Sequence, residues 1–136
     1  MSNKETAKTF FTNLWVDPEL ARSVATDDVT WITTRSMPIP GAEGTEHVGW
    51  DAVMNVATSG LKISTGYIPE TMEQTNVRWL ETEEDCVVYQ FTMECQTKAG
   101  KEYINDYLFL VELRGGKVAR FQEYWDSKQA FELLLG

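Results

Sequence analysis

The second half of the chain alternates between apolar and polar residues over two long stretches, Cys86 to Thr97 and Tyr103 to Leu113. A period of two residues is typical of a strand that buries one face and exposes the other. The predicted inner faces carry Val87, Tyr89, Phe91, Met93 and Cys95 in the first stretch, and Tyr103, Asn105, Tyr107, Phe109, Val111 and Leu113 in the second. Thr71 to Thr82 alternates more weakly and Lys117 to Trp125 follows a glycine pair, so we expect four successive strands joined by short turns.

The first half of the chain has helical periodicity instead. Between Lys4 and Leu14 the apolar residues recur at helical spacing, which predicts one amphipathic helix. Asp17 is a residue type that caps helix N-termini, and Pro18 suits the first helical position. These two residues predict a second helix that ends near Ala25.

A strand and a third helix follow, separated by a loop. Val29 to Thr34 reads as a strand with Trp31 on its inner side. Arg35 to Gly44 contains two prolines and two glycines, so we interpret it as a loop that covers a pocket. Val48 to Ser59 keeps helical spacing, and Gly60 is a plausible C-terminal stop for that helix.

Asp126 to Gln129 begins a short last helix whose apolar residues are Ala130, Phe131, Leu134 and Leu135. Runs of helices followed by runs of strands predict an α+β fold, with helices packed on one face of an antiparallel sheet. We expect residues 1–136 to form a single domain.

The outer face of the Tyr103 to Leu113 strand carries Leu108 and Leu110, with no helix left to cover them. This predicts a homodimer through the outer sheet face.

Composition narrows the class of function. The formal net charge is −9, which argues against binding of nucleic acid, because a phosphate backbone requires a basic face. The first residues lack a secretory signal pattern, and no apolar run approaches the length of a membrane span. Cys86 and Cys95 are about 30 Å apart if they lie on one strand, which is too far for a disulfide. Free thiols fit a reducing cytoplasm, and the spacing of these residues matches no metal motif.

Several short motifs, in their order along the chain, resemble the nuclear transport factor 2-like superfamily. They are Asp28-Val-Thr-Trp31, Val48-Gly-Trp-Asp-Ala-Val53, Tyr103-x-Asn105-x-Tyr107-x-Phe109, Gly116-Lys117-Val118 and Glu123-Tyr124-x-Asp126. The resemblance implies a conical, cystatin-like α+β barrel, in which a curved antiparallel sheet with helices on its concave face surrounds a cavity. The last motifs look like the SnoaL-like polyketide cyclase branch and relatives of limonene epoxide hydrolase.

Two branches of that superfamily match this chain poorly. Ketosteroid isomerases resemble it in outline, but Thr33 lies near the position of their general base. Phe10 or Phe11 lies near the position of their catalytic tyrosine. Limonene epoxide hydrolases require an arginine and a second aspartate where this chain has Tyr89, Gln90 and Phe91. The acid–base chemistry of both branches is therefore not expected here.

The SnoaL-like branch resembles the chain best. Its members use an aspartate near the end of the last strand, and Asp126 matches that position. Their assisting histidine is unmatched, since His47 is the sole histidine and lies elsewhere. The resemblance therefore implies Asp126 as a catalytic residue and no cofactor.

The turn at Gly115-Gly116 decides which carboxyl group faces the predicted cavity. A two-residue turn would place Asn105 opposite Asp126. A three-residue turn beginning at Arg114 would instead place Tyr107 opposite Glu123, because a shift of one residue reverses every side chain. We favour the three-residue turn, because it brings Ala119, Phe121, Glu123 and Trp125 to the inner face. Burial would then raise the pKa of Glu123, as a general acid or base near neutral pH requires.

Each candidate residue also has a purely structural interpretation. Asp126 is placed to cap the last helix, with Gln129 completing a capping box. Glu123 could pair with Arg120 or Arg78. Asn105 could satisfy a buried backbone group, while Trp31, Tyr107 and Trp125 could be core or pocket wall. His47 stands before a helix, where a solvent-facing or capping role is ordinary.

Two hypotheses follow. In the first, the chain is a cofactor-free cyclase, isomerase or dehydratase in which Asp126 or Glu123 transfers a proton within an apolar pocket. Asn105 and Tyr107 would then orient the ligand or stabilise an enolate oxygen. In the second, the same fold is a non-catalytic module for ligand binding or dimerisation. In both, the predicted ligand contacts are Trp31, His47, Tyr89, Asn105, Tyr107 and Trp125; no metal, nucleic acid or membrane is expected.

Overall fold

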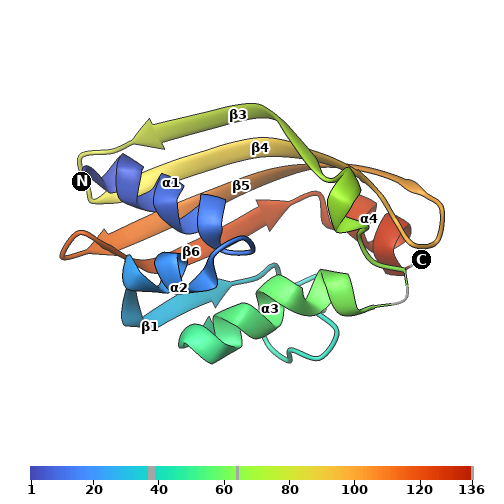
Figure 1. Cartoon of the computed structure of the whole chain (residues 1–136), viewed down its shortest axis with the longest axis horizontal. Coiled ribbons are helices and arrows are strands. Elements are labelled where there is room, and N and C mark those ends of the chain that lie inside the picture. Colours follow the sequence, from blue (N-terminus) through green and yellow to red (C-terminus); the bar gives the residue numbers. More distant parts are fainter. Residues whose placement is uncertain (37–38, 64, 136) are drawn as a thin grey trace.

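A computed structural model describes residues 1–36, 39–63 and 65–135. Its main feature is a strongly curved six-stranded sheet with helices along its concave side (Figure 1). The strands are β1 (Ala25–Ile32), β2 (Glu46–Val48), β3 (Glu73–Glu81), β4 (Cys86–Gln96), β5 (Glu102–Arg114) and β6 (Lys117–Trp125). They lie in the order β2-β1-β6-β5-β4-β3. Neighbouring strands are antiparallel except β1 and β6, which are parallel. The predicted α+β class is confirmed.

The first two helices, α1 (Asn3–Asn13) and α2 (Pro18–Ser23), form where the apolar periodicity and the Asp17-Pro18 pair predict them. Ser2 and Glu5 make a reciprocal capping box at the start of α1. The Asp17 side chain accepts from the Leu20 N–H at the start of α2, so its predicted capping role is confirmed.

The third helix, α3 (Trp50–Lys62), differs from the prediction at both ends. Val48 belongs to β2, a strand too short to produce a periodic pattern. Gly60 does not end α3, so the predicted stop is wrong. The structure needs glycine there for space, because a Cβ at Gly60 would lie 2.5 Å from the Tyr67 ring.

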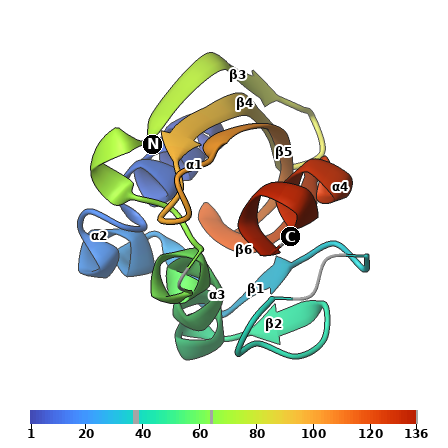
Figure 2. The same cartoon turned by 90° about the vertical axis from the view of Figure 1, so that its right-hand side faces the viewer.

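The concave face of the sheet holds the core. All the predicted inner residues of β4 and β5 are buried, so both alternation patterns are confirmed. Helix α1 packs Phe10 and Phe11 onto this face, each with its ring centroid 5.3 Å from that of Phe121. The end of the chain forms α4 (Ser127–Ala130) and a π-helical turn (Phe131–Leu135), which lie at the end of the cone that faces the viewer in Figure 2.

The β5–β6 hairpin combines features of both predicted registers. Arg114 pairs with Lys117 across a two-residue turn, and Gly115 and Gly116 have φ values of +60° and +76°. This is the type I′ geometry, so the predicted three-residue turn is wrong. Leu113 then pairs with Val118, but Glu112 pairs with Arg120, which leaves Ala119 as the extra residue of a bulge.

The bulge shifts the pairing of β6 with β5 by one residue. Beyond it, Tyr107 pairs with Trp125 and Phe109 with Glu123. The predicted pairing of Asn105 with Asp126 does not occur, and Tyr107 does not face Glu123. The inner face nevertheless carries Phe121 and Glu123 as predicted, with Val118 taking the place of Ala119. Together, the I′ turn and the bulge bury the larger Val118 while keeping Phe121 inside.

Candidate functional site

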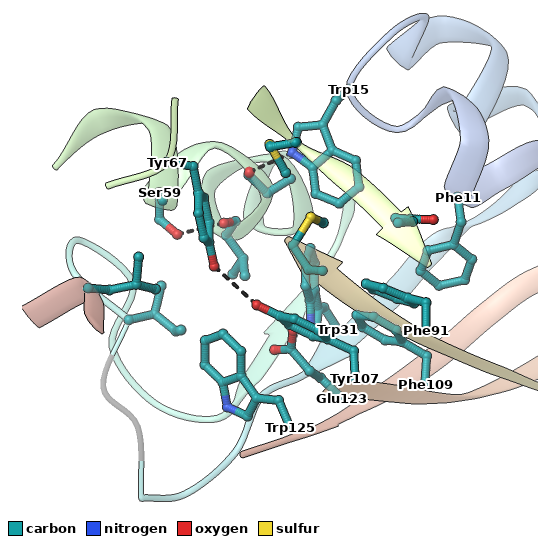
Figure 3. A pocket seen from close by; sticks show the side chains of 18 of the residues that line it. Phe11, Trp15, Trp31, Ser59, Tyr67, Phe91, Tyr107, Phe109, Glu123 and Trp125 are labelled. Atoms are coloured by element: carbon teal, nitrogen blue, oxygen red, sulfur yellow. Dashed lines mark hydrogen bonds between the residues drawn. The ribbon is translucent and has the colours of Figure 1, made fainter. Parts of the chain in front are cut away.

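A cavity of about 110 Å³ lies between the concave face of the sheet, the C-terminal half of α3 and the end of the chain (Figure 3). Its wall is mostly aromatic and aliphatic. The lining residues are Phe11, Trp15, Trp31, Ile39, Pro40, Val56, Ala57, Ser59, Gly60, Ile63, Tyr67, Met72, Gln74, Tyr89, Phe91, Met93, Tyr107, Phe109, Glu123, Trp125, Leu134 and Leu135.

The aromatic rings of β4 and β5 stack on one another along this wall. Phe91 and Tyr107 stack with their centroids 4.9 Å apart and their planes 6° apart. Phe109 continues the stack, with its ring plane 15° from that of Phe91. Because stacked rings cover one another's faces, a ring in the ligand would meet them through edge-to-face contact, which also stabilises aromatic pairs.

Glu123 is the one charged side chain among the described residues that line the cavity. Its exposed fraction is 6%, and burial raises its pKa from 4.5 to about 8. The Trp31 indole N–H acts in the opposite direction and lowers this pKa. Trp31 Nε1 is buried and has no hydrogen bond of regular geometry within the described part of the chain. The carboxyl group therefore lies in an apolar environment with one weak donor beside it.

The structural alternative for Glu123 was an ion pair. The described residues form two ion pairs, Arg114 with Asp28 and Lys128 with Glu132. Neither Arg120 nor Arg78 pairs with Glu123 in that set. Because no cation neutralises the carboxylate, desolvation dominates and the neutral form persists to higher pH.

Three tyrosine hydroxyls form a chain that reaches the cavity. The Tyr103 and Tyr107 oxygens are 2.5 Å apart, and the Tyr107 and Tyr67 oxygens are 3.2 Å apart. Asn105 Nδ2 donates to the Tyr103 oxygen at 2.9 Å. Burial raises the pKa of Tyr67 and Tyr107 well above 10, so both remain protonated at neutral pH. Tyr67 and Tyr107 line the cavity, whereas Tyr103 lies behind them, fully buried.

Asp126 does not line the cavity. Its side chain is exposed and accepts from the Gln129 N–H at 3.1 Å, which caps α4. The expected capping box is incomplete, because the Gln129 side chain donates to the Ile104 carbonyl instead. The structural interpretation of Asp126 as a helix cap is confirmed, and its carboxyl group lies outside the described cavity wall. A catalytic role of Asp126 stays a prediction.

Four of the six predicted ligand contacts line the cavity: Trp31, Tyr89, Tyr107 and Trp125. Two do not. His47 lies on β2 opposite Trp31, where its Nε2 is 3.3 Å from the Thr33 hydroxyl. It is buried, neither solvent-facing nor capping, and burial lowers its pKa. Asn105 is also buried outside the cavity, where its Nδ2 donates to the Tyr103 oxygen and to the Asp126 carbonyl.

Several other polar groups of the wall are already paired. The Tyr89 hydroxyl donates to Gln74 Oε1 at 2.6 Å. Trp125 Nε1 donates to the Thr34 hydroxyl, and Trp15 Nε1 to the Ala57 carbonyl, each at 2.7 Å. Among the described wall residues, free hydrogen-bonding capacity lies at Glu123, Trp31 Nε1, the Gln74 amide nitrogen and the tyrosine hydroxyls.

Sequence reasoning missed Tyr67, Trp15 and the C-terminal Leu134 and Leu135 as wall residues. Tyr67 lies in a connector without periodicity, and its position is set by the Gly60 contact rather than by any local pattern. The predicted covering loop contributes Ile39 and Pro40 to the wall, while residues 37–38 of that loop lie outside the described residues. Within the described ranges, no group of histidine, cysteine, aspartate or glutamate could hold a metal, and no helix could cross a membrane.

Comparison with models of known protein families and with curated proteins finds no match. Solved structures do match. An NTF2-like protein of unknown function from Burkholderia pseudomallei K96243 is 19% identical, with a TM-score of 0.79 over 100% of both chains. TerC, co-crystallised with polyporic acid, is 21% identical, with a TM-score of 0.80 over 98% of both chains. A protein from Pseudomonas putida KT2440 that is proposed to be a polyketide cyclase is 13% identical, with a TM-score of 0.72 over 98% of both chains.

Identities this low establish the fold alone. The chain has the fold of NTF2-like proteins, as its motifs predict, and it shares this fold with a protein proposed to be a polyketide cyclase.

Proposed function

We propose that this chain binds a small, mostly apolar molecule that contains a ring and an enolisable carbonyl group, and that Glu123 transfers a proton to or from it. The reaction would be a cofactor-free isomerisation, cyclisation or dehydration. The observation that carries the proposal is a single buried carboxyl group with a pKa of about 8 in an aromatic cavity. Near neutral pH such a group exists in both forms, as a general acid–base catalyst requires.

The chemistry needs one carboxyl group and one hydrogen-bond donor. The Glu123 carboxylate removes a proton from the carbon next to the carbonyl, and the electron pair of that C–H bond moves onto the carbonyl oxygen as an enolate. Return of the proton to a different carbon completes an isomerisation. Attack of the enolate carbon on a second carbonyl, which takes up the proton, completes a cyclisation. The hydroxyls of Tyr67 and Tyr107 would stabilise the enolate oxygen.

The composition of the cavity wall supports the proposed ligand class. No lysine, arginine or histidine occurs among its described residues, so a permanently anionic group would be desolvated without a counter-charge. A neutral ring compound carries no such cost and can pack against the aromatic side chains of the wall. Two structural neighbours support an organic ligand for this fold, since one was co-crystallised with polyporic acid and the other is proposed to be a polyketide cyclase.

Proton exchange tests the proposal without knowledge of the natural substrate. Acetophenone and 2-tetralone would be incubated with the protein in D₂O near pH 8, and loss of the α-proton signal would be followed by NMR. We expect exchange above the buffer rate, and a reduction of about 100-fold or more in Glu123→Gln. Tyr89→Phe is the matched control, because it removes another hydroxyl of the same wall and should leave the rate unchanged.

Other outcomes would change the conclusion. Binding of both ketones without exchange would favour a non-catalytic binding module with the same cavity. Equal exchange in the wild-type protein and in Glu123→Gln would contradict the role of the carboxyl group. Equal loss in Glu123→Gln and Tyr89→Phe would indicate general damage to the cavity instead of removal of one proton-transfer group.

We also propose that the chain forms a homodimer through the outer face of the sheet. Leu108 and Leu110 are only half-buried there, and Ile104 and Tyr124 on the same face are 40% and 47% exposed. The helices pack on the opposite face, so a second copy would cover these side chains (Figure 1). Leu110→Glu should shift the sedimentation mass from dimer to monomer, and a monomeric wild-type chain at micromolar concentration would contradict this proposal. A cytoplasmic location remains a prediction.

A further inference from the structure

A second polar group lines the cavity on the strand that lies farthest from Glu123 in the sheet. Gln74 is on β3, the edge strand, whereas Glu123 is on β6, with β4 and β5 between them (Figure 1). Three strand spacings of about 4.8 Å therefore separate the two residues along the curved surface. Both side chains line the same cavity, so a ligand that extends across the concave face can contact both.

The Tyr89 hydroxyl fixes the orientation of the Gln74 amide. Burial raises the pKa of Tyr89 to about 12, so this hydroxyl keeps its proton near neutral pH. The hydroxyl oxygen lies 2.6 Å from Gln74 Oε1. This distance is usual for an O–H···O bond and short for an N–H···O bond, so the amide presents its oxygen to Tyr89. The amide nitrogen, Nε2, consequently points away from the tyrosine hydroxyl.

Gln74 Nε2 is a free donor where the cavity opens to solvent. It makes no hydrogen bond to another described residue, and the Gln74 side chain is exposed although it belongs to the cavity wall. By contrast, Trp15 Nε1 donates to the Ala57 carbonyl at 2.7 Å, and Ser59 Oγ donates to the Val56 carbonyl at 2.6 Å. These two donors of the wall are therefore already used, whereas the Gln74 nitrogen can bind a ligand oxygen.

Two methionines accompany this donor in the wall. Met72 precedes Gln74 by two residues and so faces the same side of the extended chain, and Met93 pairs with Gln74 across the β3–β4 ladder. Methionine side chains are flexible and apolar, so they can adapt to ligands of different width. The Gln74 nitrogen is more selective, because a ligand that displaces its water either supplies an acceptor or leaves the donor unpaired.

We infer that Gln74 is a specificity-determining residue, which donates from Nε2 to a second acceptor oxygen of the ligand on the side opposite the reacting carbonyl group. The inference rests on the proposed function, since Glu123 marks the reacting end of the ligand. It assigns the ligand to ring compounds with an oxygen at each end. Acetophenone and 2-tetralone have a single oxygen, so their α-proton exchange does not require this contact.

The hydrogen bond to Tyr89 prepares the donor for binding. A free glutamine side chain loses rotamer freedom when it binds a ligand, whereas the Gln74 amide is already held by a hydroxyl of a buried residue. We expect ¹⁵N relaxation to show a more rigid side-chain amide for Gln74 than for Gln96, an exposed residue of β4 outside the wall. Equal mobility of the two amides would contradict the orientation on which the inference depends.

Two pairs of probes test the donor. 1,4-Diacetylbenzene and 4-isopropenylacetophenone differ in having an oxygen or a CH₂ group at one end. 2,6-Diacetylnaphthalene and 2-acetyl-6-isopropenylnaphthalene differ in the same way over a longer distance. In at least one pair the second acetyl group should improve binding about fivefold, as one hydrogen bond that replaces water predicts. This comparison holds whichever end of the cavity the single acetyl group of the isopropenyl probe occupies.

Three variants separate the donor from the size of the side chain. Gln74→Met should bind both members of each pair within about twofold of each other, because the second carbonyl finds no donor. Gln74→Glu keeps the side-chain length and can still accept from Tyr89, but it presents an oxygen in place of the nitrogen, so the diacetyl probes should again lose their advantage near neutral pH. Gln96→Met is the matched control and should keep the full advantage. An advantage retained in Gln74→Met or Gln74→Glu would overturn the inference.

The side-chain amide of Gln74 reports the contact directly. Its ¹⁵N–¹H signals can be identified by their loss in Gln74→Met, and one of its protons should move downfield when a diacetyl probe binds. Unchanged Gln74 signals at saturation would overturn the inference. Absence of binding of all four probes at millimolar concentration would also overturn it, because the donor is accessible from solvent.

The specificity residue and the proton-transfer group fail in different ways. Glu123→Gln should abolish α-proton exchange of the probes and keep both the advantage of the second acetyl group and the Gln74 signal shift. A wild-type protein that shows this advantage without exchange would contradict the proposed function and support the inference. Exchange with equal binding within both pairs would support the proposed function and overturn the inference.

Discussion

Glu123 on β6 lies directly opposite Phe109 on β5, and this pairing places a carboxyl group in a row of aromatic rings. Beside these rings the charged form of Glu123 loses its hydration, and no nearby cation compensates for that loss. The position of one residue in a strand ladder thus determines the chemistry available to the cavity. Its effects on stability and on the ionisation of Glu123 can be measured.

The stability of the fold should fall as the pH rises from about 4.5 to about 8. In this window Glu123 is ionised in the unfolded chain and protonated in the folded chain, because its pKa is raised from 4.5 to about 8. The folded state therefore binds more protons, and the free energy of unfolding decreases by up to about 1.4 kcal/mol per pH unit. Urea unfolding at a series of pH values would measure this slope.

Glu123→Gln is the control for that slope, because it keeps the shape of the side chain without the ionisation. The difference in unfolding free energy between the variant and the wild-type protein should grow in favour of the variant as the pH rises to 8, and then level off. A difference that does not depend on pH would show that Glu123 ionises with an ordinary pKa.

Trp31→Phe should raise the pKa of Glu123 further. The indole N–H of Trp31 is the group that lowers this pKa, and phenylalanine retains an aromatic ring without a donor. NMR titration of ¹³C-labelled glutamate carboxyl groups would show the midpoint moving to higher pH. Trp125→Phe is the matched variant, since the Trp125 indole donates to Thr34 instead, and its midpoint should stay close to that of the wild-type protein.

Asp126→Ala should reduce stability without affecting proton exchange. The Asp126 carboxylate caps α4, and loss of such a cap typically costs about 1 kcal/mol. Since its side chain lies outside the cavity wall, the α-proton exchange rate of acetophenone should remain within about twofold of the wild-type rate. A loss of exchange comparable to that in Glu123→Gln would return Asp126 to the candidate acid–base groups.

Gly60→Ala should disturb the cavity despite its favourable effect on the helix. Alanine in the interior of α3 favours the helix by about 1 kcal/mol over glycine. However, its Cβ would lie 2.5 Å from the Tyr67 ring, which must move. We expect little or no net gain in unfolding free energy and slower α-proton exchange of acetophenone. A more stable protein with an unchanged exchange rate would show that the Tyr67 ring relaxes without disturbing the cavity.

The parts of the fold that the sequence predicted are those specified by local pattern. Alternation placed every inner residue of β4 and β5, helical periodicity located α1, and capping residues located α2, because burial and hydrogen bonding act within a few residues there. The short β2 and the C-terminal extent of α3 lack such a pattern. Gly60 reads as a helix stop in isolation, whereas its role is set by Tyr67, which lies on a different segment.

The candidate site was predicted in part for the same reason. Glu123 could be placed inside because its strand neighbours are apolar on that face. The predicted turn geometry was wrong, because two combinations of turn and bulge give β6 nearly the same inner face. Local rules cannot choose between these two combinations, because the choice depends on which residue, Val118 or Ala119, is buried against the rest of the fold. Asp126 was named by resemblance, although its helix cap already accounts for it.

The bulge at Ala119 also determines on which side of the sheet the acid lies. With the same glycine turn and no bulge, Tyr107 would face Tyr124, and Glu123 would lie on the outer surface of the cone. Because Ala119 is looped out of the ladder, every residue of β6 beyond it changes its orientation together. The inward position of the acid is therefore a property of the turn and the bulge combined, and of neither alone.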